Sequence, residues 1–139
     1  MGGDLLGWQL RRRLSEVERF GRIGLHDELA IAELYRLPTD DNRDVTTLAP
    51  DELILELDVP APDASTYLKA MDRRKWAFPI VGVAAARLDG EVRIALAGVA
   101  PIPWALDSTA ALDEATPLPG TAYKAELARA LVRRAIDAI

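Results

Sequence analysis

The stretch that decides the fold is AFPIVGVAAARLDGEVRIALAGVA, residues 77–100. Its first run is apolar and β-branched at its centre, and its second run alternates, with Val92, Ile94 and Leu96 on one face. Asp89-Gly90 separates the two runs, and an Asp-Gly pair between apolar runs is a strong signal for a β-hairpin. The small residues 84–86 leave a helical start of the first run open. We therefore predict a hairpin at the centre of the chain.

A further strand is predicted before the hairpin, from Leu53 to Val59. Every second residue of this segment is apolar, the pattern of a half-buried strand. Pro60 and Pro62 end it, because proline cannot donate a hydrogen bond to a neighbouring strand. Residues 37–50 are predicted to form a loop. The mixed pattern of residues 64–74 leaves a strand and a helical turn open.

Two helices are predicted after the hairpin. Pro101, Pro103 and Trp104 turn the chain, and Asp107 or Ser108 can cap a short helix that runs through Leu112. Thr121 is predicted to cap a final helix that ends at about Ala138. That helix carries an apolar stripe, and its members are Leu127, Leu131, Ala135 and Ile139. Because strands come first and helices follow, the fold class is α+β, a small antiparallel sheet of three to four strands with helices packed on one face.

Residues 1–36 are predicted to be a helical or irregular segment, a remnant of a preceding domain, and residues 37–139 to form the main domain. Leu14, Val17 and Phe20 follow the basic triplet Arg11-Arg12-Arg13 at a helical spacing, and two glycines interrupt the pattern. We expect the triplet to be solvated, since three adjacent side chains point around a helix rather than in one direction.

The composition excludes several kinds of site. The 139 residues include no cysteine and one histidine, so the chain has no thiolate ligand for an iron–sulfur cluster and no multi-histidine metal site. A formal charge of −5 argues against nucleic acid as a partner. The longest apolar run, from Ala77 to Ala86, is too short to cross a membrane, which needs about 20 residues. No secretory signal precedes it, and we expect a cytoplasmic location.

Motifs for phosphate binding and nucleophilic catalysis are absent from the sequence, since there is no G-x-G-x-x-G, G-K-[ST] or G-x-S-x-G. Glu56 and Asp58 share a strand face, and we expect that face to be solvated. The segment from Tyr67 to Val81 is more informative, because four cationic residues lie between two aromatic ones just before the most apolar run. These cations are either solvated, with a salt bridge to Asp72, or able to reach a polar ligand at the edge of the core.

Over residues 33–139 the sequence resembles the C-terminal domain of the FAD-binding (medium) subunit of molybdenum hydroxylases, the family of carbon monoxide dehydrogenase and xanthine dehydrogenase. Five pieces match the family in order. They are Leu48–Ile54, Tyr67-Leu68-Lys69 with Arg73-Arg74, Ala77–Ala84, Arg93–Pro101 and Tyr123–Ala135. No piece is specific alone, and their common order carries the resemblance.

The resemblance implies an FAD-proximal domain of an electron-passing flavin subunit, with Ile54 and Lys69 as the cofactor contacts. It also implies a preceding FAD-binding domain with glycine-rich loops, and partner subunits that carry molybdopterin and iron–sulfur clusters. The chain alone is then expected to be inactive as an enzyme and to hold FAD weakly or not at all. The alternative is a subunit-docking or dimerisation module of the same fold without flavin, and a homodimer is one form of it. A small hydrolase finds no support, because no nucleophile–base set exists.

Overall fold

The structure is a computed structural model, and it describes residues 9–14, 26–73 and 77–139. The chain forms two compact units, residues 1–60 and residues 61–139. We call them the N-terminal unit and the C-terminal unit.

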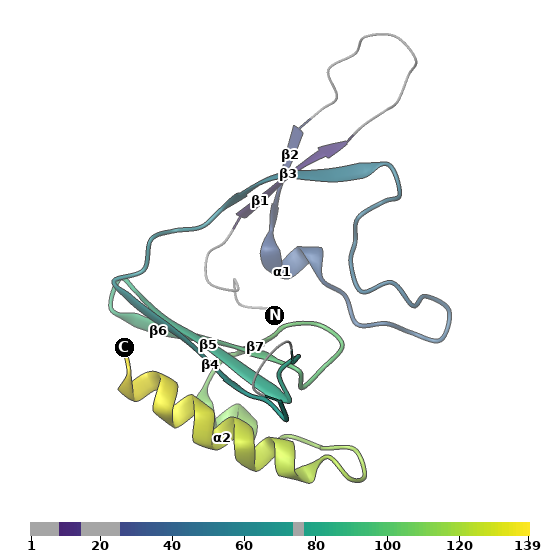
Figure 1. Cartoon of the computed structure of the whole chain (residues 1–139). Helices are drawn as coiled ribbons and strands as arrows, with labels where there is room; N and C mark the ends of the chain where they lie inside the picture. The colour runs from purple at the N-terminus through teal and green to yellow at the C-terminus, as the bar shows by residue number, and fades with distance from the viewer. Residues whose placement is uncertain (1–8, 15–25, 74–76) are drawn as a thin grey trace, which may run out of the picture. The chain divides into compact units, whose positions relative to one another are not determined.

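The C-terminal unit contains an antiparallel sheet in the order β4-β5-β6-β7 (Figure 1). Its strands are β4 (Ala64–Ala70), β5 (Val81–Leu88), β6 (Glu91–Ala97) and β7 (Trp104–Leu106). The predicted hairpin is confirmed as β5 and β6, and the open question about residues 64–74 is answered by strand β4. Asp89 and Gly90 between β5 and β6 have positive φ values of 50° and 81°, as a type I′ turn requires at both central residues.

The helices of this unit cover one face of the sheet. The 3₁₀ helix η1 spans Thr109–Leu112, and the helix α2 spans Ala122–Asp137 and packs on β4 and β5. The sequence of α2 is rich in alanine, leucine and arginine, which are good helix formers, and Arg134 lies in the last turn where it suits the helix dipole. The predicted α+β class, with a four-stranded antiparallel sheet and helices on one face, is confirmed.

The hydrophobic core of the C-terminal unit lies between α2 and the sheet. Val81 and Val83 of β5 are fully buried and face Leu131 and Ala135 of α2, which are 6% and 0% exposed. Burying an aliphatic side chain of this size contributes about 1.5–3 kcal/mol. Because alternate residues of a strand point to opposite faces, these residues also define which face of the sheet remains uncovered within the unit.

The N-terminal unit is built around a second antiparallel sheet, in the order β2-β1-β3. Its elements are β1 (Gln9–Leu14), β2 (His26–Ala30), the short helix α1 (Ile31–Leu34) and β3 (Glu52–Asp58). The helical expectation is wrong for residues 11–14, which form β1, while Val17 and Phe20 lie outside the described residues. Residues 11–14 are extended because β1 pairs with β2 and β3. The spacing of residues along one segment gives no information about such pairing with distant segments.

The division between the two units also differs from the predicted domain boundary. It falls after Pro60 rather than after residue 36, because β3 pairs with β1 and has no partner in the four-stranded sheet. Strand β3 itself is confirmed, but its half-buried face is not. Leu53, Leu55 and Leu57 are 62%, 45% and 44% exposed, so the alternating leucines of β3 lie on an accessible surface.

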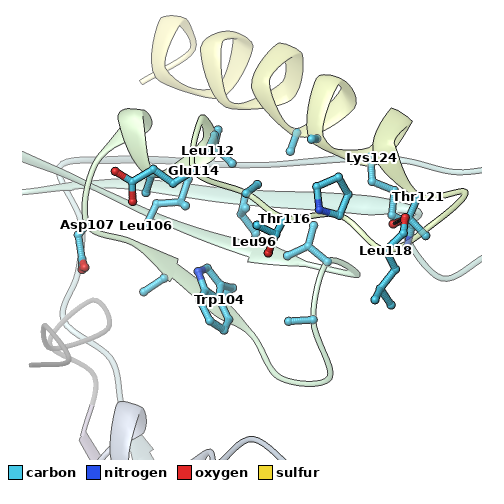
Figure 2. A pocket seen from close by; sticks show the side chains of 18 residues that line it. Leu96, Trp104, Leu106, Asp107, Leu112, Glu114, Thr116, Leu118, Thr121 and Lys124 are labelled. Atoms are coloured by element: carbon cyan, nitrogen blue, oxygen red, sulfur yellow. Dashed lines mark hydrogen bonds between the residues drawn. The ribbon is translucent and has the colours of Figure 1, made fainter.

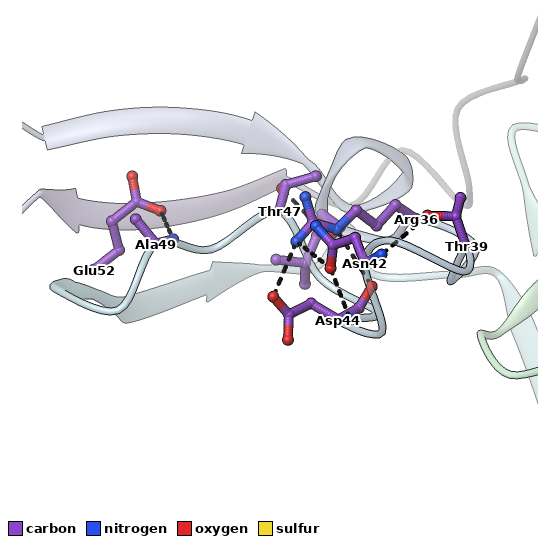
Figure 3. A network of polar contacts seen from close by, with 8 residues as sticks. Arg36, Thr39, Asn42, Asp44, Thr47, Ala49 and Glu52 are labelled. Carbon is purple, nitrogen blue, oxygen red and sulfur yellow. Dashed lines mark hydrogen bonds and ion pairs between the residues drawn. The ribbon is translucent and has the colours of Figure 1, made fainter.

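The loop between α1 and β3, predicted from its prolines and aspartates, is confirmed and is held by polar contacts of Arg36 (Figure 3). The Arg36 side chain donates to the Asp44 backbone oxygen and forms an ion pair with the Asp44 carboxylate, both at 3.3 Å. The Asn42 side-chain oxygen accepts from the Asp44 N–H at 2.9 Å. Thr47 closes the loop by donating its N–H to the Leu34 oxygen at 2.8 Å.

Candidate functional site

Lys69, the cofactor contact implied by the family resemblance, lies on β4 with an exposed side chain. It pairs across the sheet with Gly82 of β5, and its neighbours Leu68 and Ala70 pack against the core. The alternation along β4 therefore places Lys69 on the sheet face that points away from α2. Its Nζ donates to the backbone oxygen of Ala77 at 3.4 Å, which ties the ammonium to the segment just before β5.

The face that carries Lys69, here called the open sheet face, is formed mostly by small residues. Its members alternate with the core residues of β4, β5, β6 and β7, and they are Ser65, Tyr67, Lys69, Gly82, Ala84, Ala86, Leu88, Glu91, Arg93, Ala95, Ala97 and Ala105. In the described part of the C-terminal unit, η1 and α2 lie on the opposite side. The alanines of β5 and β6 make the central part of this face flat, while the Tyr67 ring lies over Gly82, which is buried.

Ile54, the second predicted contact, lies on β3 of the N-terminal unit and is 39% exposed. Ile54 and Lys69 thus belong to different units, and their common site stays a prediction. Glu56 and Asp58 lie on the same strand with exposed side chains.

The segment between β4 and β5 is only partly described. Arg74, Lys75 and Trp76 of the predicted basic cluster lie outside the described residues, so the choice between solvation and ligand contact stays open for them. Phe78 is 94% exposed, although Ala77 beside it is buried. An aromatic side chain that is almost fully accessible, next to the oxygen that accepts from Lys69, extends the surface that the C-terminal unit offers to a partner or ligand.

A cavity of about 620 Å³ lies on the other face of the sheet, and sequence patterns do not reveal it (Figure 2). It is bordered by β6, β7, η1, the segment that follows η1 and the first turns of α2. Leu96 and Leu112 form its buried floor, while Trp104 and Leu118 are 44% and 74% exposed. Of the two proline-containing turns in this part of the sequence, residues 117–119 contribute Pro117 and Leu118 to the lining, while residues 101–103 lie between the lining residues Ala100 and Trp104.

The part of the chain that the structure describes contains neither a metal-ligand cluster nor a membrane-spanning helix. No three side chains of histidine, cysteine, aspartate or glutamate gather in a way that could hold a metal ion. No helix there is both long enough and apolar enough to span a membrane.

Comparison with known proteins identifies a related subunit. The sequence is 36% identical over 95 residues to the aldehyde oxidoreductase FAD-binding subunit PaoB of Escherichia coli K12, covering 66% of this chain and 30% of the relative. No protein-family model matches the sequence.

The fold has a counterpart among solved structures. A carbon monoxide dehydrogenase from Hydrogenophaga pseudoflava, which lacks the Mo-pyranopterin moiety of its cofactor, matches 97% of this chain with a TM-score of 0.72 at 20% identity. This chain spans about half, 53%, of the matched chain and less than a third of the Escherichia coli subunit. The resemblance found in the sequence is thereby confirmed: this chain is similar in sequence to an FAD-binding subunit and shares its fold with a carbon monoxide dehydrogenase chain.

Proposed function

We propose that this chain is the C-terminal, FAD-proximal domain of a flavin subunit that passes electrons in a molybdenum hydroxylase-type oxidoreductase. The observation that carries the proposal is the position of Lys69. The lysine that matches the family motif stands exposed on the open sheet face, two residues from Tyr67 and above small side chains. When bound, FAD supplies the redox chemistry of such a subunit.

The alanines 84, 95 and 97 form a flat area of the open sheet face beside Tyr67 and Lys69, and a flat area of small side chains suits the flat ring system of a flavin. The Lys69 ammonium has three N–H donors and uses one on the Ala77 oxygen. Its remaining donors and its charge would hold the ring and favour negative charge on it after reduction. Ile54 would contribute a second contact from the N-terminal unit.

The same residues do not fit the pyrophosphate of FAD. Neither a glycine-rich phosphate loop nor a Walker-type lysine occurs in the sequence. We therefore assign the pyrophosphate to a preceding FAD-binding domain, and we expect the isolated chain to be catalytically incomplete.

Partner subunits would carry the remaining redox centres. Substrate oxidation belongs to a molybdopterin subunit and electron relay to an iron–sulfur subunit, since this chain has no cysteine and a single histidine. These partners, and a cytoplasmic location, are part of the proposal.

A second candidate function is a subunit-docking or dimerisation module that holds no flavin. The exposed leucines 53, 55 and 57 of β3 favour it, because accessible apolar strands are typical of surfaces that another chain covers. The two candidates differ in whether Lys69 affects a flavin.

The test uses the complete flavin subunit that contains this chain. Lys69→Ala should weaken FAD binding and lower the two-electron flavin potential by about 20 mV, which corresponds to about 1 kcal/mol of lost charge stabilisation. Lys69→Arg should retain most of the potential, and Arg133→Ala on the exposed side of α2 is the control for loss of a cation. Unchanged FAD binding and potential in Lys69→Ala would favour the docking module.

A further inference from the structure

The cavity beside α2 lies on the sheet face opposite to Lys69, so it is distinct from the proposed flavin contact. Its volume of about 620 Å³ falls within the range of about 300–1,000 Å³ that is usual for small-molecule sites. Leu96 and Leu112 are 3% and 6% exposed and provide a dry floor. Trp104 borders the cavity from β7 and keeps 44% of its surface accessible, which leaves indole surface available for contact.

The charges around this cavity are unequal at its two ends. Figure 2 shows Asp107 and Glu114 at one end and Lys124 at the other. Within the described residues, neither Asp107 nor Glu114 has a hydrogen bond or an ion pair. Asp113, next to Glu114 in the chain, is instead paired with Arg129 at 3.1 Å and does not line the cavity.

The opposite end carries the positive charge of Lys124, whose ammonium uses one of its three N–H donors within the unit. Lys124 Nζ donates to the Gly98 oxygen at 2.8 Å, and the Thr121 hydroxyl donates to the Leu118 oxygen at 2.8 Å. A ligand in the cavity therefore meets two carboxylates without a counter-ion at one end, leucine side chains in the middle, and an accessible indole on β7.

We propose that this cavity binds an organic cation with an apolar body, with the positive group at Asp107 and Glu114 and the apolar body against Leu96 and Leu118. The carboxylates attract the cation, and each exposed ion pair contributes up to about 1 kcal/mol. The accessible indole of Trp104 offers further apolar surface to the body of the ligand. The two carboxylates outnumber Lys124 among the charged residues that line the cavity, so anionic ligands are disfavoured. This inference does not rest on the proposed flavin function.

The probes are octyltrimethylammonium, octanoate and octanol, each added to the full chain below its micelle concentration. The indole N–H of Trp104, assigned by its loss in Trp104→Phe, reports binding in a proton–nitrogen correlation spectrum. The cation should bind about tenfold more tightly than octanoate, with octanol between them.

Variants separate the charge from the apolar contact. The double variant Asp107→Asn/Glu114→Gln should weaken binding of the cation about tenfold and leave octanol unchanged, which also shows that the cavity is intact. The double variant Asp63→Asn/Asp137→Asn removes the same charge outside the cavity and should leave all three affinities unchanged. Leu118→Ala should weaken the cation and octanol alike.

Four results would overturn the proposal. Octanol could bind as tightly as the cation, the Asp107/Glu114 variant could keep the original preference, or no probe could shift the Trp104 signal at millimolar concentration. The fourth result is that the probes shift only the signals of the exposed leucines of β3, which would show that they bind there and not in the cavity.

Discussion

The Tyr67 side chain lies against the α-carbon of Gly82, so close that a Cβ at position 82 would stand 2.6 Å from the phenol oxygen and 3.2 Å from Cζ. The register pairs Gly82 with Lys69 and pairs Tyr67 with Ala84, so the Tyr67 ring leans diagonally across the strand pair. Because position 82 has no side chain, the ring can lie beside the lysine position on the open sheet face.

The first prediction concerns this contact. Gly82→Ala should displace the Tyr67 ring, while the free energy of unfolding changes by less than about 1 kcal/mol, since the atom it meets is the end of a flexible side chain and alanine suits a strand better than glycine. Ring proton shifts of Tyr67 and urea unfolding measure the two effects. In a Tyr67→Ala background the same substitution should leave neighbouring shifts almost unchanged. A loss of more than about 2 kcal/mol would show that the ring cannot move.

A second glycine should tolerate no side chain. Gly98 has a φ of 77°, and a Cβ there would lie 2.7 Å from the Pro79 oxygen and 2.9 Å from the Ile80 oxygen, both of them backbone atoms. Gly98→Ala combines a left-handed backbone with a collision that no side-chain rotation relieves, and we expect a loss of about 3 kcal/mol or more in urea unfolding.

Gly90 provides the matched control for Gly98. Its φ is 81°, and nothing lies within 4 Å of a Cβ built there. Gly90→Ala should therefore lower the free energy of unfolding by about 1–2 kcal/mol, the cost of a left-handed backbone conformation at a residue with a side chain. Equal losses for the two variants would contradict the collision at Gly98.

Arg129 should stabilise the contact between η1 and α2. Its guanidinium donates to the Asp113 carboxylate at 3.1 Å, to Glu126 at 2.7 Å and to the Leu112 oxygen at 2.9 Å. Arg129→Ala should lower the free energy of unfolding by about 1–2 kcal/mol, and part of the loss should shrink at high salt because the acidic partners are exposed. Thermal unfolding followed at the helix signal measures it.

The control for this variant is Arg133→Ala, which removes an exposed arginine from the same helix. It should change stability by less than about 0.5 kcal/mol. Arg129→Lys should fall between the two, because lysine keeps the charge but lacks the planar fork. No difference between Arg129→Ala and Arg133→Ala would contradict the role assigned to the three contacts.

Cofactor binding by the isolated chain gives the fourth prediction. Added FAD should keep the absorption spectrum of free FAD and should be removed by gel filtration, because no phosphate loop in the sequence holds the pyrophosphate. Lumiflavin, which lacks the phosphates, should bind no more weakly than FAD. A stable yellow complex with FAD would show that this chain holds the whole cofactor.

Much of the C-terminal unit could be predicted from the sequence, because its signals lie within short contiguous segments. Asp89-Gly90 marks the hairpin, and the spacing of Leu131 and Ala135 marks the buried side of α2. Lys69 as a site residue came from the family motif rather than from periodicity. Only the structure shows on which face of the sheet Lys69 lies, and that its Nζ donates a hydrogen bond to the Ala77 oxygen.

The remaining features depend on contacts between distant segments. Strand β7 follows a proline-containing turn and is only three residues long, so its pairing with β6, rather than its own pattern, defines it. The sequence predicts that the basic residues 11–13 lie on the solvated surface of a helix. They form strand β1 instead, because β2 and β3 supply hydrogen-bond partners on both of its edges.

The sequence by itself determined the hairpin, the final helix and the α+β class, since each depends on residue types at fixed spacings along the chain. It also carried the resemblance to flavin subunits, through five short segments in a common order. Only the tertiary structure decided that the leucines of β3 are exposed, that Tyr67 lies on Gly82, and that a cavity opens beside Trp104. Exposure and cavities are properties of what packs against a residue. They follow from the summed energy of many long-range contacts, which a local pattern of residue types does not contain.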